Sequence, residues 1–368
     1  MTYGTVQANA IQGSINTFSP NSAVFRNRII NGAMVIDQRN AGASVSFAAS
    51  ASGYTLDRFL VENVTDGALT VQRSTVAPTG FTNSALITIT TADASLGATQ
   101  RCRILQAIEG FNTADLGFGT ANAKSVTLSF WVRSSLTGTF GGALNNGDVN
   151  RSYPFTYTIS SANTWEQKTI TVAGETTGTW NTGNTVGMYV QFGLGVGSTF
   201  SGTAGSWATS QIMSATGAVS VVGTNGATFY ITGVQLEVGS TATSFDYRPY
   251  GTELALCQRY FEKSYSTSTA VATNTTEGYY TMTSTTNANG FLIFPLRFKV
   301  EKRGAPIITG YQTDGTSGNW NYVRSGASGT NAVNADNIGT GGCRFFVSTG
   351  ANYTAGLIEG HWIASAEL

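Results

Sequence analysis

The sequence TFYITGVQLEVGSTATSFDYRPYGTELALCQRYFEK, from Thr228 to Lys263, determines how the chain is organised. Its first part alternates in the way an extended strand does, because successive side chains of a strand point to opposite faces. We expect one face to carry Tyr230, Val234, Leu236 and Val238, and the other to carry Phe229, Ile231, Gln235 and Glu237. Both faces of this strand should therefore be partly covered.

The second part of this stretch leaves the strand and predicts the one short helix of the chain. It crosses Arg248-Pro249, where proline disfavours helix in the residue before it. Leu254, Cys257 and Phe261 then follow at helical spacing, which predicts a helix over roughly Thr252 to Lys263. So short a helix does not persist alone in water and must be held by packing. Its apolar stripe could dock on its own domain or meet two further copies near a threefold axis.

Short alternating segments run from Arg26 to about Arg248 and are separated by Gly, Asn, Ser and Thr clusters. This spacing is typical of an antiparallel β-sandwich. The weakly patterned stretch from Ser198 to Thr224 is expected to form surface loops. The clearest predicted strands are Leu69 to Val76, Ala85 to Thr90, Val126 to Arg133, Tyr153 to Ile159, Gln167 to Val172, Met188 to Val196 and Thr228 to Val238.

Strand patterns return after the helix and predict a second, smaller sandwich. Pro295 argues that its strand is an edge strand or carries a bulge. The predicted strands are Tyr279 to Thr283, Phe291 to Val300, Pro306 to Tyr311, Trp320 to Arg324, Cys343 to Ser348 and Leu357 to Leu368. The chain is thus predicted to be all-β, with a polar segment at 1–25, a sandwich at 26–248, a linker helix at 249–263 and a second sandwich at 264–368.

Composition excludes several classes of function. The chain has 368 residues, 20 Lys and Arg against 20 Asp and Glu, and only 11% charged residues, where about 25% is ordinary. A chain with this charge balance has no excess of positive charge with which to bind nucleic acid and release its counterions. No apolar run approaches the length of a membrane helix, and the start resembles no secretion signal. Cys102, Cys257 and Cys343 are too scattered for a metal cluster and are expected to be small buried hydrophobes.

Three motifs carry a family resemblance. They are NRIINGAMVIDQRNAG at Asn27 to Gly42, YTLDRF at Tyr54 to Phe59, and the part of the Thr228 to Lys263 stretch that begins at Val234. Together they resemble bacteriophage tail-fibre and related virion appendage proteins. The Asn31-Gly32 pair and FYITGVQLE are also similar to the carbohydrate-binding jelly rolls, although Thr232-Gly233 stands where those modules often have an acidic residue. The part from Gly290 to the closing HWIASAEL is similar to phage fibre-tip domains.

The resemblance implies a virion structural protein that is assembled in the host cytoplasm and released by lysis. It implies a jelly-roll variant of the sandwich, an N-terminus at 1–25 that attaches to other virion proteins, and a homotrimer. Because such fibres are generally trimers, we favour self-association through Leu254, Cys257 and Phe261. No cofactor, nucleic acid or membrane insertion is expected.

The strand from Val126 to Arg133 offers the sharpest glycan-binding candidates. With its alternate residues in the core, Trp131 and Arg133 project from the opposite face. An aromatic plane with fixed donors suits sugars, which present C–H groups on a ring face and hydroxyls around the rim. Tyr189 and Gln191 project similarly from another strand, and the two outer faces would make one groove if these strands are neighbours. The alternative, favoured by how often large aromatics are buried, is that a loop or a neighbouring subunit covers Trp131.

A second candidate site lies in the C-terminal part, in the segment from Gly310 to Asn337. Loops on a rigid scaffold carry recognition, and we expect this segment to contact the host. Its aromatic and polar candidates are Tyr311, Asn319, Trp320 and Tyr322. The equally weighted alternative is that Trp320 and Tyr322 are packed strand residues.

Catalytic chemistry finds little support in the sequence. His361 has Glu359 on the same strand face but no nucleophile arranged with it, and we expect it to be structural. Asp37 and Asp57 are expected to bind backbone or loop groups, with calcium coordination as the alternative. Carboxylates that could be paired as in glycosidases are Asp37, Asp57, Glu62, Asp66, Glu166 and Glu175.

The leading hypothesis is therefore a non-enzymatic receptor-binding phage appendage that touches cell-surface glycan or another envelope component. A capsid decoration or tail connector with a purely structural role is the first alternative. A glycan depolymerase is the second, although the chain shows no repeats of the kind that long parallel β-helices require.

Overall fold

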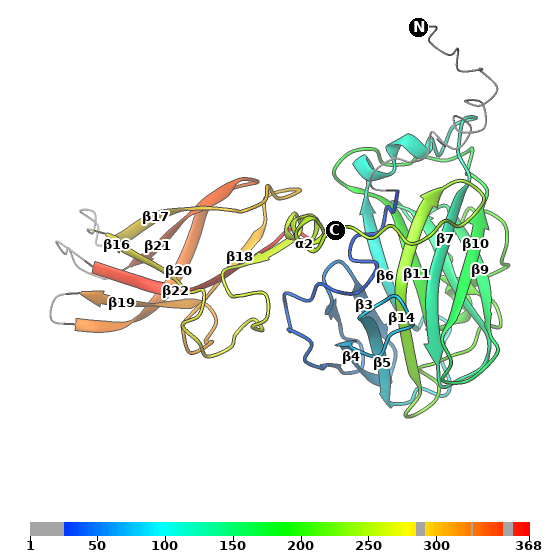
Figure 1. Cartoon of the computed structure of the whole chain (residues 1–368), viewed down its shortest axis with the longest axis horizontal. Coiled ribbons are helices and arrows are strands. Elements are labelled where there is room, and N and C mark those ends of the chain that lie inside the picture. The colour runs from blue at the N-terminus through cyan, green and yellow to red at the C-terminus, as the bar shows by residue number, and fades with distance from the viewer. Residues whose placement is uncertain (1–25, 285–290, 325–326, 349–355) are drawn as a thin grey trace, which may run out of the picture.

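A computed structural model describes residues 26–284, 291–324, 327–348 and 356–368. The segment at 1–25, predicted to attach the protein to a virion, lies outside these residues. The described chain is almost entirely β, as the alternation predicted, and Figure 1 shows two β modules with one helix between them. Within the described residues, no helix has the length and apolar character needed to cross a membrane.

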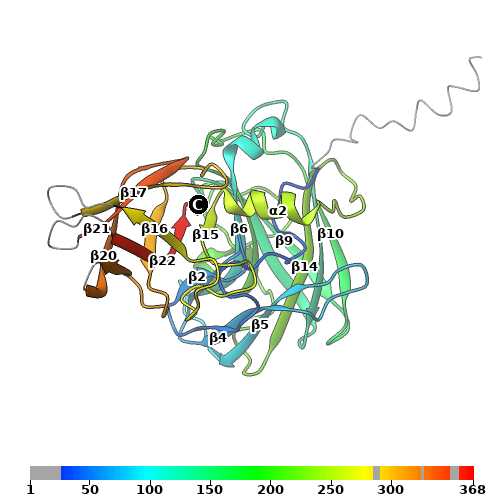
Figure 2. The ribbon, with the colours of Figure 1, turned by 60° about the vertical axis from the view of Figure 1, so that its left-hand side comes forward.

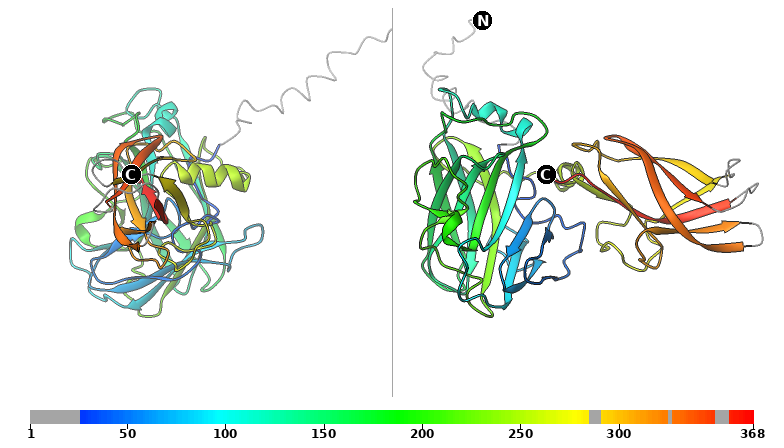
Figure 3. Two further views of the ribbon diagram at one scale, coloured as in Figure 1. Left: turned by 90° about the vertical axis from the view of Figure 1, so that its left-hand side faces the viewer. Right: turned by 180° about the vertical axis from the view of Figure 1, so that it is seen from behind.

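The first module is a sandwich of two six-stranded antiparallel sheets, which stand face to face in Figure 3. The first sheet has the order β1 (Val45–Phe47), β4 (Ala68–Ser74), β5 (Ser84–Thr91), β14 (Thr228–Val238), β7 (Val126–Ser134) and β10 (Glu166–Val172). The second sheet has the order β2 (Ser52–Tyr54), β3 (Leu60–Val64), β6 (Arg101–Glu109), β11 (Val186–Val196), β8 (Gly138–Asn146) and β9 (Ser152–Ile159). Every strand predicted for this module is present.

The core of the sandwich lies between the inner faces of the two sheets. Phe130 of the first sheet meets Phe192 of the second with ring centroids 4.8 Å apart. Phe140 and Phe229 are also fully buried there. Such interdigitated apolar residues supply most of the favourable free energy of folding.

Strand β14 contains a bulge that changes which face its residues occupy. Its pairing with β7 shifts register between Thr232 and Gln235, and Gly233 has φ of +61°. Phe229 and Ile231 point into the core before the bulge, and Val234 and Leu236 do so after it. The simple alternation therefore assigned faces wrongly on one side of Gly233, because an extra residue in a strand reverses the order of faces.

The stretch from Ser198 to Thr224 is more than surface loop. It contains η3 (Ser198–Phe200), β12 (Ser201–Gly202) and β13 (Ser214–Ala215), and β13 packs against β8 and β9. Met213, Val221 and Val222 are buried. The short 3-10 helices η1 (Gly110–Asn112) and η2 (Ala114–Leu116) close another part of the sandwich.

Helix α2 (Tyr250–Gln258) is shorter than predicted, because the chain turns at Arg259 and re-enters a strand. Phe261, expected on the helix, begins β15 (Phe261–Lys263), which pairs with β22 (Gly356–Ser365). Figure 1 shows α2 lying between the two modules, and Figure 2 shows the same helix from another side. We call this region, with the residues of both modules that contact it, the joint.

The second module is one curled sheet of eight strands built around β22. β15 and β18 (Ile307–Tyr311) pair with the end of β22, and β16 (Tyr280–Ser284) and β19 (Asn319–Arg324) pair with its beginning. β20 (Ala327–Gly339), β21 (Gly342–Ser348) and β17 (Phe291–Arg297) continue the sheet. Strand β17, which contains Pro295, ends the strand order, as this proline predicted. Phe294, Trp320 and Phe345 stack at the centre of its core.

The motifs that carry the family resemblance build the joint. Arg58 of the DRF sequence pairs with Glu367, and Glu109 of β6 accepts hydrogen bonds from Arg259 at 2.6 Å and from the Tyr260 hydroxyl at 2.8 Å. Figure 3 places the C-terminus at this same point. Charged and aromatic contacts on both sides of α2 therefore hold the two modules against each other.

The proposed self-association surface is used inside the chain instead. Cys257 is fully buried in a cluster with Ile30, Ile36 and Tyr260, and Phe261 is 2% exposed. Leu254 packs against the same cluster. The helix docks on its own chain, because the first module supplies the apolar partners that the short helix needs.

Candidate functional site

The predicted groove between Trp131 and Tyr189 does not exist. Trp131 lies on β7 in the first sheet, whereas Tyr189 and Gln191 lie on β11 in the second. Because the inner faces of these two sheets form the core, their outer faces look away from each other. The sequence identified outward residues on each strand but could not assign the strands to sheets.

Gln191 is a structural residue of the second sheet. It is 1% exposed, and its side chain bonds to Arg103 and to Asn145. Asn145 in turn donates to the Ser152 hydroxyl at 2.6 Å. Because Gln191 is buried and bonded in this way, its side chain is not available to bind a ligand. Tyr189 is half-buried nearby, and burial raises the pKa of its hydroxyl.

Trp131 belongs to a row of aromatic side chains on the outer face of the first sheet. A Cβ atom placed at Gly233 would lie 2.7 Å from the ring of Phe81 and 3.0 Å from that of Trp131. The glycine at the bulge therefore lets both rings approach the sheet. Phe81 then contacts Phe245 and Tyr247 with ring centroids 5.1 Å and 5.5 Å apart. We call Trp131, Phe81, Phe245 and Tyr247 the aromatic strip.

Arg133 lies on the same face, one pair of positions further along β7. Its guanidinium carbon sits 5.1 Å from the ring centroid of Tyr230, which also contacts Trp165 at 6.0 Å. All three side chains are half-buried. A cation over an aromatic face is held by the ring quadrupole, so Arg133 presents fixed donors beside the strip.

The strip runs into a pocket at the joint with a volume of about 220 Å³. Phe245, Tyr247 and Tyr250 line it on one side, together with Val35. Tyr247 is 56% exposed and Tyr250 55% exposed, so both rings are open to solvent. A second pocket, of about 130 Å³, shares Tyr250 with the first.

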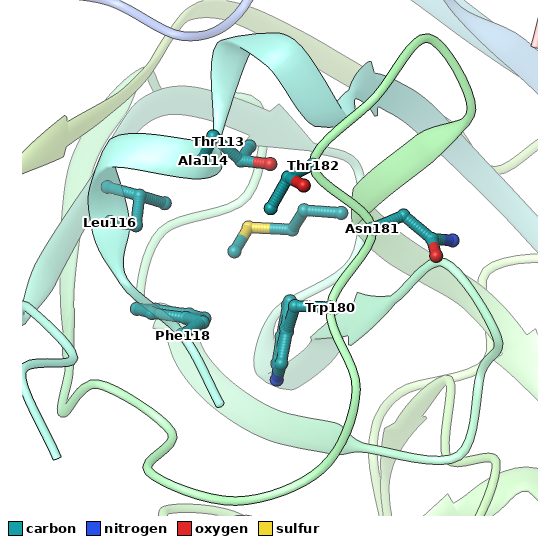
Figure 4. Close-up of a pocket in the computed structure, with 8 residues that line it drawn as sticks. Thr113, Ala114, Leu116, Phe118, Trp180, Asn181 and Thr182 are labelled. Atoms are coloured by element: carbon teal, nitrogen blue, oxygen red, sulfur yellow. The ribbon is translucent and has the colours of Figure 1, made fainter. Parts of the chain in front are cut away.

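A smaller cup opens at the end of the sandwich, beside η2. Figure 4 shows Leu116, Phe118 and Trp180 around it, and the rings of Phe118 and Trp180 meet edge to face at 4.7 Å. Its volume is about 10 Å³, which is the space of about one water molecule. The cup is too small for a sugar ring, and we assign this cluster to packing.

The C-terminal candidates divide between core and surface. Trp320 is 0% exposed, stacks on Phe294 and Phe345, and donates its indole N–H to the His361 carbonyl at 2.8 Å. It is a core residue and cannot touch a host, as the packing alternative stated. Tyr322 packs against the same core.

Tyr311 and Asn319 are half-buried near the middle of the second module. Tyr311 pairs with His361 on β22, and its ring lies 6.3 Å from Tyr265. The segment between them bonds back to the chain, since Thr275 N donates to Thr313 O at 2.8 Å. Part of the predicted contact segment, residues 325–326, lies outside the described residues.

His361 is structural, as expected. It is fully buried, stacks on Tyr265 at 3.7 Å, and lies 3.2 Å from the Ser264 hydroxyl and 2.9 Å from the Thr275 carbonyl. Burial lowers the pKa of its imidazole. Among the described residues, Glu359 forms no hydrogen bond or ion pair with this imidazole.

The candidate carboxylates serve separate structural contacts. Asp37 accepts the backbone N–H groups of Asn40 and Gly42 at 2.9 Å and 2.7 Å, and Asp57 bonds to Gln38. Both behave as the sequence predicted. Among the residues that the structure describes, no group of three or more His, Cys, Asp or Glu side chains could hold a metal ion.

The remaining carboxylates also have local partners. Glu62 pairs with Arg101 and Arg103 on the second sheet, which holds the pKa of its carboxyl below the ordinary value despite burial. Glu166 pairs with Lys168 on β10 of the first sheet. The three free cysteines are buried.

Comparisons with known proteins are distant. No family model matches the chain, and no curated protein sequence matches it. The enzymatically active domain of tailspike protein 4 from bacteriophage CBA120 is 13% identical over 59% of this chain and 22% of that chain, with a TM-score of 0.31. A family 4 carbohydrate-binding module is 16% identical over 57% of this chain and 98% of that chain, with a TM-score of 0.28.

A family 11 carbohydrate-binding module from Clostridium thermocellum, in complex with a mixed-linked tetrasaccharide, is 10% identical over 54% of this chain and 91% of that chain, with a TM-score of 0.26. This chain thus spans under a quarter of the tailspike chain. At TM-scores of 0.31 and below, these likenesses carry no argument about this protein.

Sequence reasoning missed Phe81, Phe245, Tyr247 and Tyr250. The stretch FDYRPY, at residues 245–250, contains three aromatics in six positions, but its proline and the preceding Gly-Ser-Thr segment indicate only the exit from a domain. Closely spaced aromatics in a segment without core periodicity were the available signal. Phe81 lies in a turn before β5, far from this stretch in the sequence, so only the fold brings its ring to these aromatics.

Proposed function

We propose that this protein is a non-enzymatic attachment protein of a phage particle and that it binds cell-surface glycan. The observation that carries the proposal is the aromatic strip, which sets Trp131 and Tyr247 on the outer face of a rigid sheet. Flat aromatic faces pack against the C–H side of sugar rings, and neighbouring polar groups then select hydroxyls. The charge balance of zero suits a hydroxyl-rich ligand rather than a polyanion.

The proposal that the protein is displayed on a virion is based on the motifs of the first module and the joint, which resemble those of phage appendage proteins. A trimer, or several copies on each particle, would raise avidity through effective concentration without any new contact. Since Cys257 and Phe261 are enclosed in the joint, subunit contacts would use other surfaces.

The test is a glycan array probed with the full-length chain and with two variants. Trp131→Ala should weaken binding about tenfold, or by about 1.4 kcal/mol. Phe111→Ala is the matched control, because Phe111 is an exposed aromatic outside the strip, and it should bind like the parent. Absence of glycan binding by the parent chain would overturn the proposal.

Two further measurements address catalysis and location. Incubation with host polysaccharide should release no reducing ends, and turnover would instead favour a depolymerase. Imaging of intact particles with a labelled chain should place several copies on an appendage, whereas capsid labelling would favour a decoration protein.

A further inference from the structure

The two pockets at the joint share one residue of their linings. Tyr250 lines both, and Val35 in one pocket precedes Ile36 in the other. The first pocket has a mainly apolar surface that includes three aromatic rings, and the second is more polar, with Thr267 and Ser268 contributed by the second module. Their combined volume reaches the range of small-molecule sites, which begins at about 300 Å³.

We propose that these pockets form one groove that binds a neutral oligosaccharide across both modules. The inference rests on the proposed glycan-binding function and assigns it a second site. Phe245 and Tyr247 belong to both the strip and the groove. A sugar chain that leaves the strip therefore continues past Tyr250 toward Ser268.

The charges in the groove favour a neutral ligand, because its lining carries the three carboxylates of Asp37, Asp246 and Glu253 against the two guanidinium groups of Arg73 and Arg248. Asp246 accepts the Asn27 N–H at 3.2 Å, and Glu253 pairs with Arg248 at 3.2 Å. Arg73 donates to the Val35 carbonyl at 2.8 Å. An anionic sugar would therefore meet a lining with one more negative than positive charge.

Hydroxyl groups supply the remaining polar surface of the groove. Those of Tyr250, Thr267 and Ser268 have no hydrogen-bond partner among the described residues, and all three residues are exposed. Hydroxyls both donate and accept, as sugar hydroxyls do. The exposed tyrosine ring adds an apolar plane to the lining of both pockets.

The floor of the groove is held in place before any ligand arrives. The Asn31 side chain donates to the carbonyls of Ile36 and Asp57 at 2.8 Å and 3.0 Å, and Glu253 accepts the Asn31 N–H. Arg248 donates to the Ile29 carbonyl at 3.1 Å. A preformed site loses little conformational entropy on binding.

Because the two linings share only Tyr250, a single sugar residue can occupy one pocket, whereas a longer oligosaccharide can occupy both. Affinity should therefore rise with the number of linked residues. The experiment uses the full-length chain on an array of neutral and sialylated oligosaccharides of one to six residues. The strongest neutral binder on the array is then titrated by calorimetry.

Three variants define the outcome. Tyr250→Ala should weaken the titrated binding about tenfold or more, whereas Tyr250→Phe should keep most of it because the ring remains. Ser268→Trp should block the second pocket and remove the gain from longer oligosaccharides. Each site is exposed, so the fold should be retained, and circular dichroism verifies this.

The results separate this inference from the general function. If Trp131→Ala abolishes binding while Tyr250→Ala and Ser268→Trp leave it unchanged, the groove is overturned and the glycan-binding function stands. Preferential binding of sialylated oligosaccharides would also overturn the groove. If the parent chain binds no oligosaccharide, both proposals fall.

Discussion

Trp131 and Tyr189 lie on opposite outer faces of the sandwich, although each follows the same alternating pattern in its strand. Trp131 comes directly after Phe130, whose ring meets Phe192 of the second sheet in the core. Two outward residues of strands that pack face to face cannot share a groove. The candidate site is therefore the aromatic strip and the joint, and not a groove between these two strands.

The opposite placement predicts unequal effects of two substitutions. Trp131→Ala should lower glycan affinity about tenfold, while Tyr189→Ala should leave it unchanged, because the strip runs only along the first sheet. Calorimetric titration of both variants with one oligosaccharide checks this. Equal losses would place the ligand outside the strip.

Trp320→Ala should act on stability rather than on recognition. Removing a fully buried tryptophan from between Phe294 and Phe345 leaves a cavity and should cost about 3–5 kcal/mol. Urea unfolding followed by near-ultraviolet circular dichroism measures the loss. A stable variant with reduced cell binding would contradict the core assignment.

Glu262 and Lys302 form an ion pair in which both side chains are 0% exposed and the charged atoms are 2.5 Å apart. Glu262→Gln should destabilise the protein by about 3–5 kcal/mol, because the ammonium is left buried without its counter-charge. The double variant Glu262→Leu with Lys302→Met should recover part of this loss. Additive losses in the double variant would show that the two side chains act independently.

Stability should rise with alkaline pH through Lys263. Burial lowers the pKa of its ammonium from 10.5 to about 8, so between these values the unfolded chain binds more protons than the folded chain. Raising the pH from 8 to 10 should then stabilise the parent relative to Lys263→Met by about 1–3 kcal/mol. Parallel pH profiles of unfolding free energy in the two proteins would refute this.

Several strands were predictable because alternation is a local property. The residues of β7, β9 and β14 were identified nearly to their ends, and Pro295 marked the strand that ends the sheet order. Strands β6 and β8 were missed. Gln106 and Glu109 of β6 are buried polar residues that bond to other segments, so their strand lacks clear alternation.

The candidate site was predictable only at Trp131 and Arg133. Phe81, a neighbour of Trp131, is 152 positions from Gly233, and Tyr247 lies beyond the end of the strand, so no local pattern joins them. Trp320 and Trp131 carry similar strand patterns in the sequence, yet one is enclosed and the other is half-buried. The difference arises from what covers each strand.

The sequence by itself determined the all-β class, the position of the joint after β14 and the absence of charge suited to a polyanion. It did so because alternation, proline and net charge are local or additive properties. Only the tertiary structure decided which sheet each strand joins, where the bulge at Gly233 reverses the faces, and that α2 docks on its own chain. These depend on contacts between residues far apart in the chain, which no local pattern records.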